Sequence, residues 1–138
     1  MDKTLRAGVI GLGLLGNSHS AYLCNDMRTE LVAAAEVREQ AAAEAPAKNG
    51  IKVYSNYQDM LAKEGLDLVV VATPDSLHRE PVIACAEAGL KYIIVEKPLA
   101  TTVLDGQEML DACRMAGSKL WVHLSNRVNP MDIATRYV

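Results

Sequence analysis

Short apolar runs alternate with segments of helical periodicity along the chain, and this alternation predicts the fold. The apolar runs predict six strands, over residues 5–10, 30–37, 52–54, 68–72, 91–95 and 119–124. The segments between them predict helices that end near residue 25, extend over 39–48, end near 63, extend over 81–88 and end at 116. Strands and helices that alternate through short loops are typical of a parallel sheet covered by helices on both faces. We therefore expect an α/β fold, a doubly wound parallel sheet with strand order 3-2-1-4-5-6.

Residues that begin and end helices support these positions. Asn56 and Thr102 are suited to N-caps, and Pro81 is suited to the first position of a helix. Gly89 and Gly117 follow their helices as C-terminal stops. Each expected helix is therefore bounded by residues that favour its ends.

Composition excludes several classes of protein. The chain has 138 residues, enough for one domain, and the absence of Phe means that its core must be aliphatic. The net charge is −3, with acidic and basic residues interspersed, which argues against a nucleic-acid partner. No apolar stretch approaches the ~18 residues of a membrane span. Cys24, Cys85 and Cys113 form no C-x-x-C pair, which favours reduced thiols in a cytoplasmic protein over disulfides or a metal site.

The N-terminal residues superficially resemble a secretory signal peptide. Lys3 and Arg6 precede an apolar run over residues 7–16. That run contains four glycines, and no small-x-small cleavage site follows it. The glycines are better explained by a binding turn.

Residues 11–16, Gly-Leu-Gly-Leu-Leu-Gly, match the G-x-G-x-x-G pattern of a dinucleotide-binding Rossmann fold. The pattern follows an expected strand and opens an expected helix, which is the context that makes it specific. Gly11 permits the tight turn, Gly13 lets the backbone approach a pyrophosphate, and Gly16 lets the helix pack on the strand. Leu14 and Leu15 belong to the first turn of that helix, and we include them among the cofactor-binding residues. The alternative is a glycine-rich turn with no ligand.

Glu36 stands twenty residues beyond the last glycine, at the expected end of the second strand. A carboxylate there can accept hydrogen bonds from the adenosine ribose and repels a 2′-phosphate, which favours NAD over NADP. Arg38 complicates this choice, because its guanidinium could pair with that phosphate. We therefore expect NAD, with NADP possible. Glu36 could also be a solvated residue at the end of a strand.

Three further segments follow the last three expected strands. They are Ala72-Thr73-Pro74-Asp75-Ser76-Leu77-His78, Glu96-Lys97-Pro98 and Asn126-Arg127-Val128-Asn129-Pro130. Ligands of open α/β sheets bind at the carboxyl ends of the strands. All three segments are therefore expected at the edge where a nicotinamide would lie.

Together these motifs resemble the glucose–fructose oxidoreductase / inositol dehydrogenase / rhizopine-catabolism (Gfo/Idh/MocA) family. The resemblance covers residues 5–130 and also includes His19 in the first helix. Two positions depart from the family pattern. Asp75 stands where Asn is frequent, and Val128 stands where an aromatic residue is common.

The resemblance implies roles for the residues at the strand ends. Lys97 would lie beside the nicotinamide and the reacting carbon, where its ammonium can stabilise charge on the substrate oxygen. Glu96 would lie near the nicotinamide ribose, and Arg127 would face the nicotinamide or the substrate. The cofactor trough would be lined by Ala72, Thr73, Pro74 and His78.

Each of these roles has a simpler alternative. His78 could cap a helix, Arg127 could pair with a surface carboxylate, and Lys97 could be a solvated lysine. His19 is interpreted as a partly buried histidine with satisfied hydrogen bonds. His123, inside the sixth strand, is assigned no function, and no metal site is expected.

The domain division follows from the last motif. Residues 1–125 are expected to form the dinucleotide-binding domain, and 126–138 to start the connection to a C-terminal domain that the family has and this sequence lacks. The sequence ends within an expected helix, which favours a fragment of a longer protein.

The resemblance implies an NAD(P)-dependent oxidoreductase acting on a sugar, cyclitol or related polyol, and a homo-oligomer. The alternative is a dinucleotide-binding or sensing module without catalysis. Glu96, Lys97 and Arg127 favour the enzyme, because nucleotide binding alone does not need a lysine at the nicotinamide end. The isolated chain is expected to be inactive.

Overall fold

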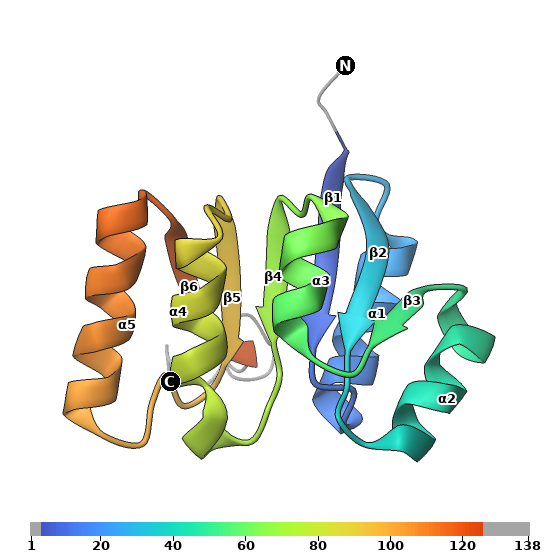
Figure 1. The fold of residues 1–138 in the computed structure, drawn as a ribbon, viewed down its shortest axis with the longest axis horizontal. Coiled ribbons are helices and arrows are strands. Elements are labelled where there is room, and N and C mark those ends of the chain that lie inside the picture. Colours follow the sequence, from blue (N-terminus) through green and yellow to red (C-terminus); the bar gives the residue numbers. More distant parts are fainter. Residues whose placement is uncertain (1–3, 126–138) are drawn as a thin grey trace, which may run out of the picture.

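The protein is a six-stranded parallel sheet between two layers of helices, as seen in the computed structural model (Figure 1). The structure describes residues 4–125, apart from the side chains of residues 46–49. The strands pair in the order β3-β2-β1-β4-β5-β6, and every pair is parallel. Their bounds are Leu5–Ile10 (β1), Thr29–Ala35 (β2), Lys52–Tyr54 (β3), Leu68–Val71 (β4), Tyr92–Glu96 (β5) and Lys119–His123 (β6). The predicted fold class and strand order are confirmed.

Five α-helices and one short 3₁₀ helix connect these strands. They are α1 (Leu14–Asn25), α2 (Glu39–Asn49), α3 (Tyr57–Glu64), α4 (Arg79–Glu87), α5 (Val103–Ala116) and the 3₁₀ helix η1 (Asp75–Leu77). Helices α3, α4 and α5 lie in a row in front of the sheet in Figure 1, and α1 lies behind it. The sheet is therefore covered on both faces.

Each face of the sheet has its own aliphatic core. Strand β4 contributes to both cores, since all four of its residues are buried and successive side chains point to opposite faces. Val69 and Val71 pack with Met60, Ile93 and others in the larger core. Val70 packs in a second core with Val9, Leu12, Ala34, Ala45 and Ile51. Apart from Tyr54 in the larger core, the buried apolar residues of the described chain are aliphatic, Met or Cys, so the expected aliphatic core has one aromatic exception.

The helix caps follow the sequence prediction. The side chain of Asn56 accepts a hydrogen bond of 2.8 Å from the backbone N–H of Asp59, and that of Thr102 accepts one of 3.1 Å from the N–H of Asp105. Gly117 ends α5 with a φ of 72°, a left-handed conformation that favours glycine.

Two predicted boundaries were wrong. Helix α4 begins at Arg79, so Pro81 is its third residue and not its first; the N–H that proline lacks would have had no partner within the helix there either. Strand β2 was predicted to end at Val37 but ends at Ala35. Val37 is 82% exposed. The prediction was too long because Val37 is apolar, although it lies outside the strand.

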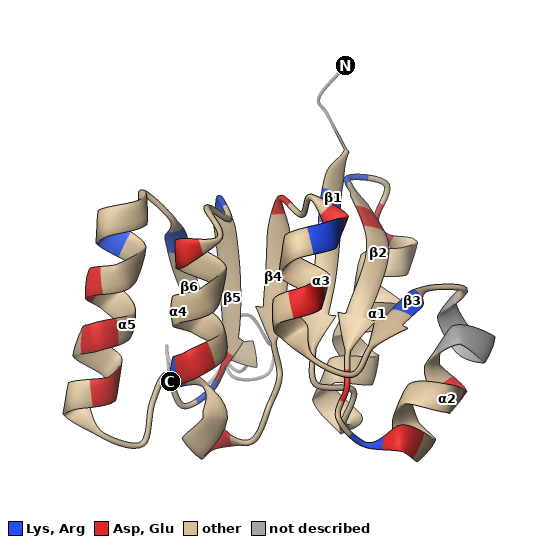
Figure 2. Cartoon of the chain, in the orientation of Figure 1, with Lys and Arg blue, Asp and Glu red and all other residues tan. Residues whose placement is uncertain are grey.

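Charged residues of both signs lie on the helices in front of the sheet, and acidic residues predominate on α5 (Figure 2). Lys and Arg are interspersed with Asp and Glu over α3 and α4 (Figure 2). Arg79 of α4 forms ion pairs with Asp105 and Glu108 of α5, which ties the two helices together. Within residues 4–125, no helix combines the length and the apolar character needed to cross a bilayer.

Candidate functional site

The turn between β1 and α1 shows two glycines that the fold itself requires. Gly11 has a φ of 91°, and a Cβ there would lie 2.7 Å from the carbonyl oxygen of Ala72. A Cβ on Gly16 would lie 1.8 Å from the carbonyl oxygen of Gly11. Side chains at both positions are excluded by neighbouring backbone.

Gly13 differs from these two glycines. Its φ of −71° suits any residue, and a Cβ there would meet no atom within 4 Å. Nothing in the described chain therefore requires a glycine at this position. The open space above it fits the close approach of a pyrophosphate to the backbone, and the first-turn amides of α1 lie beside it.

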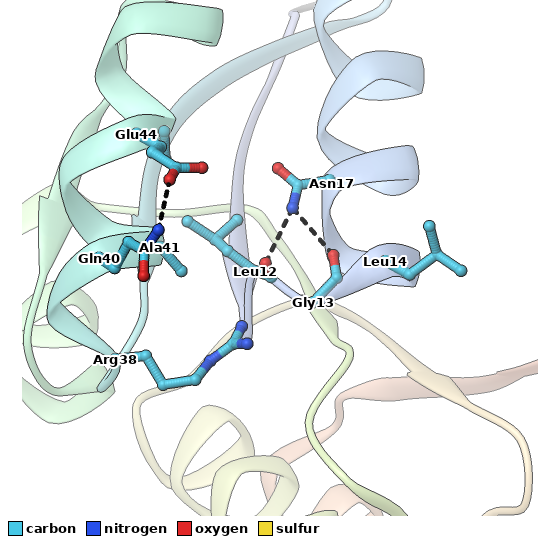
Figure 3. Close-up of a pocket in the computed structure, with 9 residues that line it drawn as sticks. Leu12, Gly13, Leu14, Asn17, Arg38, Gln40, Ala41 and Glu44 are labelled. Atoms are coloured by element: carbon cyan, nitrogen blue, oxygen red, sulfur yellow. Dashed lines mark hydrogen bonds between the residues drawn. The ribbon is translucent and has the colours of Figure 1, made fainter.

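Asn17 positions this turn, a role that sequence reasoning missed. Its Nδ2 donates hydrogen bonds of 2.8 Å to the carbonyl oxygen of Leu12 and 3.0 Å to that of Gly13 (Figure 3). The two carbonyls are thereby held toward the helix side. Leu14, at the start of α1, is 86% exposed, and Leu15 is also exposed.

A cavity of about 480 Å³ adjoins the turn and opens between α1 and α2 (Figure 3). Arg38 lies at one side of it, and Gln40 and Ala41 line it from α2. The full lining is Leu12, Gly13, Leu14, Asn17, Arg38, Gln40, Ala41, Glu44 and Ala45. The cavity therefore joins the glycine turn to the first turn of α2.

Glu36 links the glycine turn to Arg38 at this end. Its carboxylate accepts a hydrogen bond of 2.8 Å from the backbone N–H of Leu12 and one of 2.9 Å from the backbone N–H of Arg38. It accepts two more from the Arg38 guanidinium. The guanidinium and the backbone N–H groups outweigh the burial of the carboxyl and lower the pKa of Glu36 to about 2. Glu36 is thus an ionised carboxylate bonded to Leu12 and Arg38, two residues that line the cavity.

The loop after β4 is fixed by His78. Its ring is 1% exposed, with Nε2 3.1 Å from the carbonyl oxygen of Thr73 and Nδ1 2.9 Å from that of Pro98. The imidazole therefore joins the loop after β4, which contains Ala72, Thr73 and Pro74, to the loop after β5. His78 is the N-cap residue of α4, as the simpler alternative had it, but its side chain makes no capping hydrogen bond and bonds the two loops instead.

Glu96 and Lys97 occupy the carboxyl end of β5 with opposite exposure. Glu96 is 4% exposed, whereas Lys97 is exposed and is joined to Pro98 by a cis peptide bond. The backbone N–H of Lys97 lies 3.3 Å from Oε2 of Glu96. The ammonium of Lys97 is thus available at the edge where the strands end.

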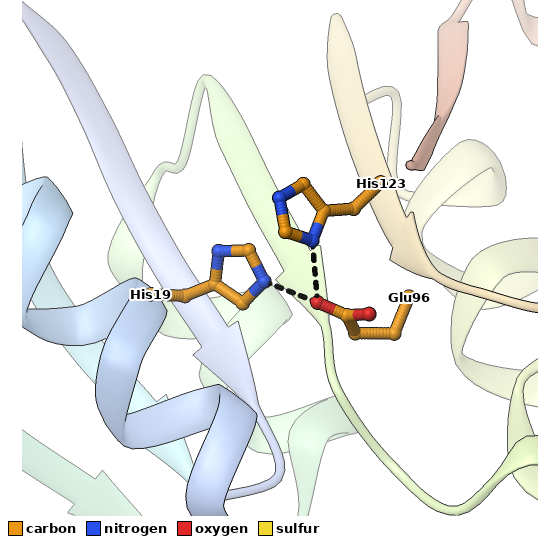
Figure 4. A group of neighbouring side chains, drawn as sticks. All are labelled: His19, Glu96 and His123. Carbon is orange, nitrogen blue, oxygen red and sulfur yellow. Dashed lines mark hydrogen bonds and ion pairs between the residues drawn. The ribbon is translucent and has the colours of Figure 1, made fainter. Parts of the chain in front are cut away.

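Two histidines meet the other oxygen of Glu96 (Figure 4). Nε2 of His19 lies 2.6 Å and Nδ1 of His123 lies 2.8 Å from Oε1, and the two rings are in edge contact. Burial raises the pKa of Glu96, and the hydrogen bonds from both histidines outweigh it and lower the pKa. Sequence reasoning anticipated a satisfied His19 but assigned no function to His123. Arg127 lies outside the described residues.

Comparison with known proteins identifies the family of this chain. The profile of the oxidoreductase family with an NAD-binding Rossmann fold, Gfo/Idh/MocA, matches residues 5–124. The chain belongs to this family. The predicted resemblance is therefore confirmed.

Among Gfo/Idh/MocA relatives, the inositol 2-dehydrogenase of Salmonella typhimurium is 31% identical over 121 residues, which are 85% of this chain and 35% of the relative. The myo-inositol 2-dehydrogenase of Thermotoga maritima is 33% identical over 124 residues, 89% of this chain and 37% of the relative. This chain thus spans little more than a third of these curated relatives.

Solved structures of the family superpose closely on this Rossmann domain. The WlbA dehydrogenase from Bordetella pertussis, in complex with NADH and UDP-GlcNAcA, has a TM-score of 0.91 and 34% identity, over 98% of this chain and 41% of that one. Biliverdin reductase from Synechocystis sp. PCC 6803, in complex with biliverdin and NADP+, has a TM-score of 0.90 and 25% identity, over 98% of this chain and 42% of that one. Members of the fold thus bind either coenzyme.

Proposed function

We propose that this chain is the coenzyme-binding part of an NAD-dependent dehydrogenase that acts on a sugar, cyclitol or related polyol. The observation that carries the proposal is Gly13, whose bare backbone serves no contact within the described chain. A ligand that must approach the backbone closely explains this glycine, and the family's NAD-binding fold identifies the class of ligand.

The residues at the carboxyl ends of the strands fit an extended dinucleotide. The pyrophosphate would lie on the turn of residues 11–16, and the adenosine ribose would lie beside Glu36 and Arg38. The nicotinamide ribose would lie near Glu96, between the loop of residues 72–74 and the end of β5. When bound, NAD accepts a hydride at its nicotinamide ring.

Lys97 is the residue we assign to catalysis. The substrate C–H bond would break as the hydride passes to NAD, and the hydroxyl on the same carbon would release its proton to water as the carbonyl forms. The Lys97 ammonium would hydrogen-bond the substrate oxygen and stabilise the negative charge that develops on it. A binding or sensing module would have no use for an exposed lysine at this place.

The substrate class rests on the relatives. Two of the relatives named above are inositol dehydrogenases, and the family profile covers residues 5–124 of this chain. Residues 1–125 would then form the coenzyme domain and 126–138 the connection to a substrate domain. We also propose a cytoplasmic homo-oligomer; Trp121, half exposed on the edge strand β6 beside Tyr92, is a candidate contact.

Titration of the purified chain with NAD, followed by an assay of NADH formation from myo-inositol and glucose, tests the proposal. NAD binding without NADH formation is expected, because one lysine at an open strand edge cannot enclose a substrate. A chain that binds neither NAD nor NADP would overturn the coenzyme assignment. Turnover that Lys97→Ala abolishes would show that the chain alone carries enough of the active site.

A further inference from the structure

A cluster of His19, Glu96 and His123 lies at the carboxyl ends of β5 and β6, outside the glycine turn and the cavity that adjoins it. The three side chains come from α1, β5 and β6, and they point toward one another (Figure 4). Their nearest nitrogen and oxygen atoms all lie within 4.8 Å of one another. Residues far apart in sequence thus present three donor atoms to one small volume.

The contacts of Glu96 divide between its two oxygens. Both imidazoles are directed at a single oxygen, Oε1, at 2.6 and 2.8 Å, while Oε2 faces the backbone N–H of Lys97. The pairing of His123 with Glu96 follows from the parallel register of β5 and β6, which places the two residues opposite each other. The cluster is therefore built into the sheet.

The donor set matches a class of ion. Two imidazole nitrogens and one carboxylate oxygen are typical ligands of zinc and of similar first-row divalent ions. With metal–ligand bonds of about 2.0–2.2 Å, tetrahedral ligand atoms lie roughly 3.4 Å apart. The two nitrogen–oxygen separations of 2.6 and 2.8 Å are shorter than that value, and all three atoms lie within 4.8 Å of one another, so an ion would enter as the imidazoles move outward from Oε1.

We propose that Nε2 of His19, Oε1 of Glu96 and Nδ1 of His123 bind a divalent transition-metal ion such as Zn²⁺ or Co²⁺. Each neutral imidazole would carry its remaining proton on the other ring nitrogen. The side chain of His123 is 40% exposed, so the fourth coordination position opens to solvent. The ion would place a fixed positive charge one residue from Lys97.

The proposal is tested with the metal alone, on the full chain after treatment with a chelator. Titration with Co²⁺ is followed by visible absorption and with Zn²⁺ by calorimetry. One ion per chain and the spectrum of a four-coordinate Co²⁺ site are expected. His19→Ala and His123→Ala should each weaken binding at least about 100-fold, whereas Cys24→Ser, which removes an exposed thiol outside the cluster, should leave it unchanged.

His123→Gln covers the case in which His123→Ala does not fold. Its amide can still hydrogen-bond Glu96 but is a poor metal ligand, so thermal unfolding near that of the wild type with loss of Co²⁺ binding supports the site. A wild-type chain that binds Co²⁺ no better than the His123 variants overturns it. The proposed NAD binding is measured separately without metal, so either proposal can fail while the other stands.

Discussion

Glu36 holds the guanidinium of Arg38 with hydrogen bonds of 3.0 Å from Nε and 2.9 Å from Nη2. The Glu36 carboxylate, which disfavours a 2′-phosphate, also pairs with the Arg38 guanidinium, which could otherwise bind one. Coenzyme preference therefore depends on this pair and not on either residue alone.

Glu36→Ala should raise the affinity for NADP relative to NAD roughly tenfold or more, since a charge-assisted hydrogen bond contributes about 1.5–3 kcal/mol. The substitution removes the repulsion and frees Arg38. Titrations with both coenzymes measure the ratio, and Glu36→Ala combined with Arg38→Ala is the control that should lose the gain. An unchanged ratio in the single variant would mean that Glu36 does not face the ribose.

Gly13→Val should leave the thermal midpoint of unfolding close to that of the wild type, because a Cβ at this position meets no atom within 4 Å. NAD affinity should nevertheless fall on the order of 100-fold, a cost of about 3 kcal/mol. The side chain would occupy the space that the pyrophosphate needs. Unchanged affinity would count decisively against the binding turn.

Gly16→Ala should behave in the opposite way. The new methyl group would lie 1.8 Å from the carbonyl oxygen of Gly11, so the backbone at one of the two residues must shift. A loss of several kcal/mol in the free energy of unfolding is expected, as for an overpacked core. Denaturant unfolding measures it, and a stability within about 0.5 kcal/mol of the wild type would contradict the geometry.

Glu36 should also contribute to acid stability. Its pKa is lowered from an ordinary value of 4.5 to about 2 in the folded chain, chiefly by the Arg38 guanidinium. The stabilisation is therefore fully present above pH 4.5 and is lost as pH falls toward 2. Glu36→Gln should be less stable than the wild type near neutrality, and the difference should shrink over that window. A difference independent of pH would exclude this carboxylate as the source.

His78→Leu should destabilise the domain by about 1–3 kcal/mol, because the imidazole N–H that donates to a backbone carbonyl oxygen, of Thr73 or of Pro98, is lost. The loops that follow β4 and β5 should also loosen, which hydrogen exchange at Thr73 and Lys97 can detect. Unchanged exchange with unchanged stability would show that His78 does not join the loops.

Local patterns predicted much of this molecule. Strand β4 and the turn of residues 11–16 could be identified because uniform β-branched runs and spaced glycines each have few structural uses. The order of the strands then followed from general rules for parallel sheets. These rules also placed the motifs after β4 and β5 on one edge.

Contacts between distant segments could not be predicted in the same way. His123 meets Glu96 only because of the register between β5 and β6, and meets His19 only because α1 packs behind the sheet. Asn17 likewise bonds carbonyls whose direction depends on the folded turn. No spacing in the sequence encodes these distances.

The three glycines of the turn should differ in how readily they are substituted during evolution. Gly11 and Gly16 are kept by the chain's own backbone, so any descendant that folds must retain them or rebuild the turn. Under the proposed function, Gly13 is required by the ligand alone. In a homologue that no longer binds the coenzyme, Gly13 would be the first of the three to be substituted. A bulky residue at this position would then indicate that binding has been lost while the fold is retained.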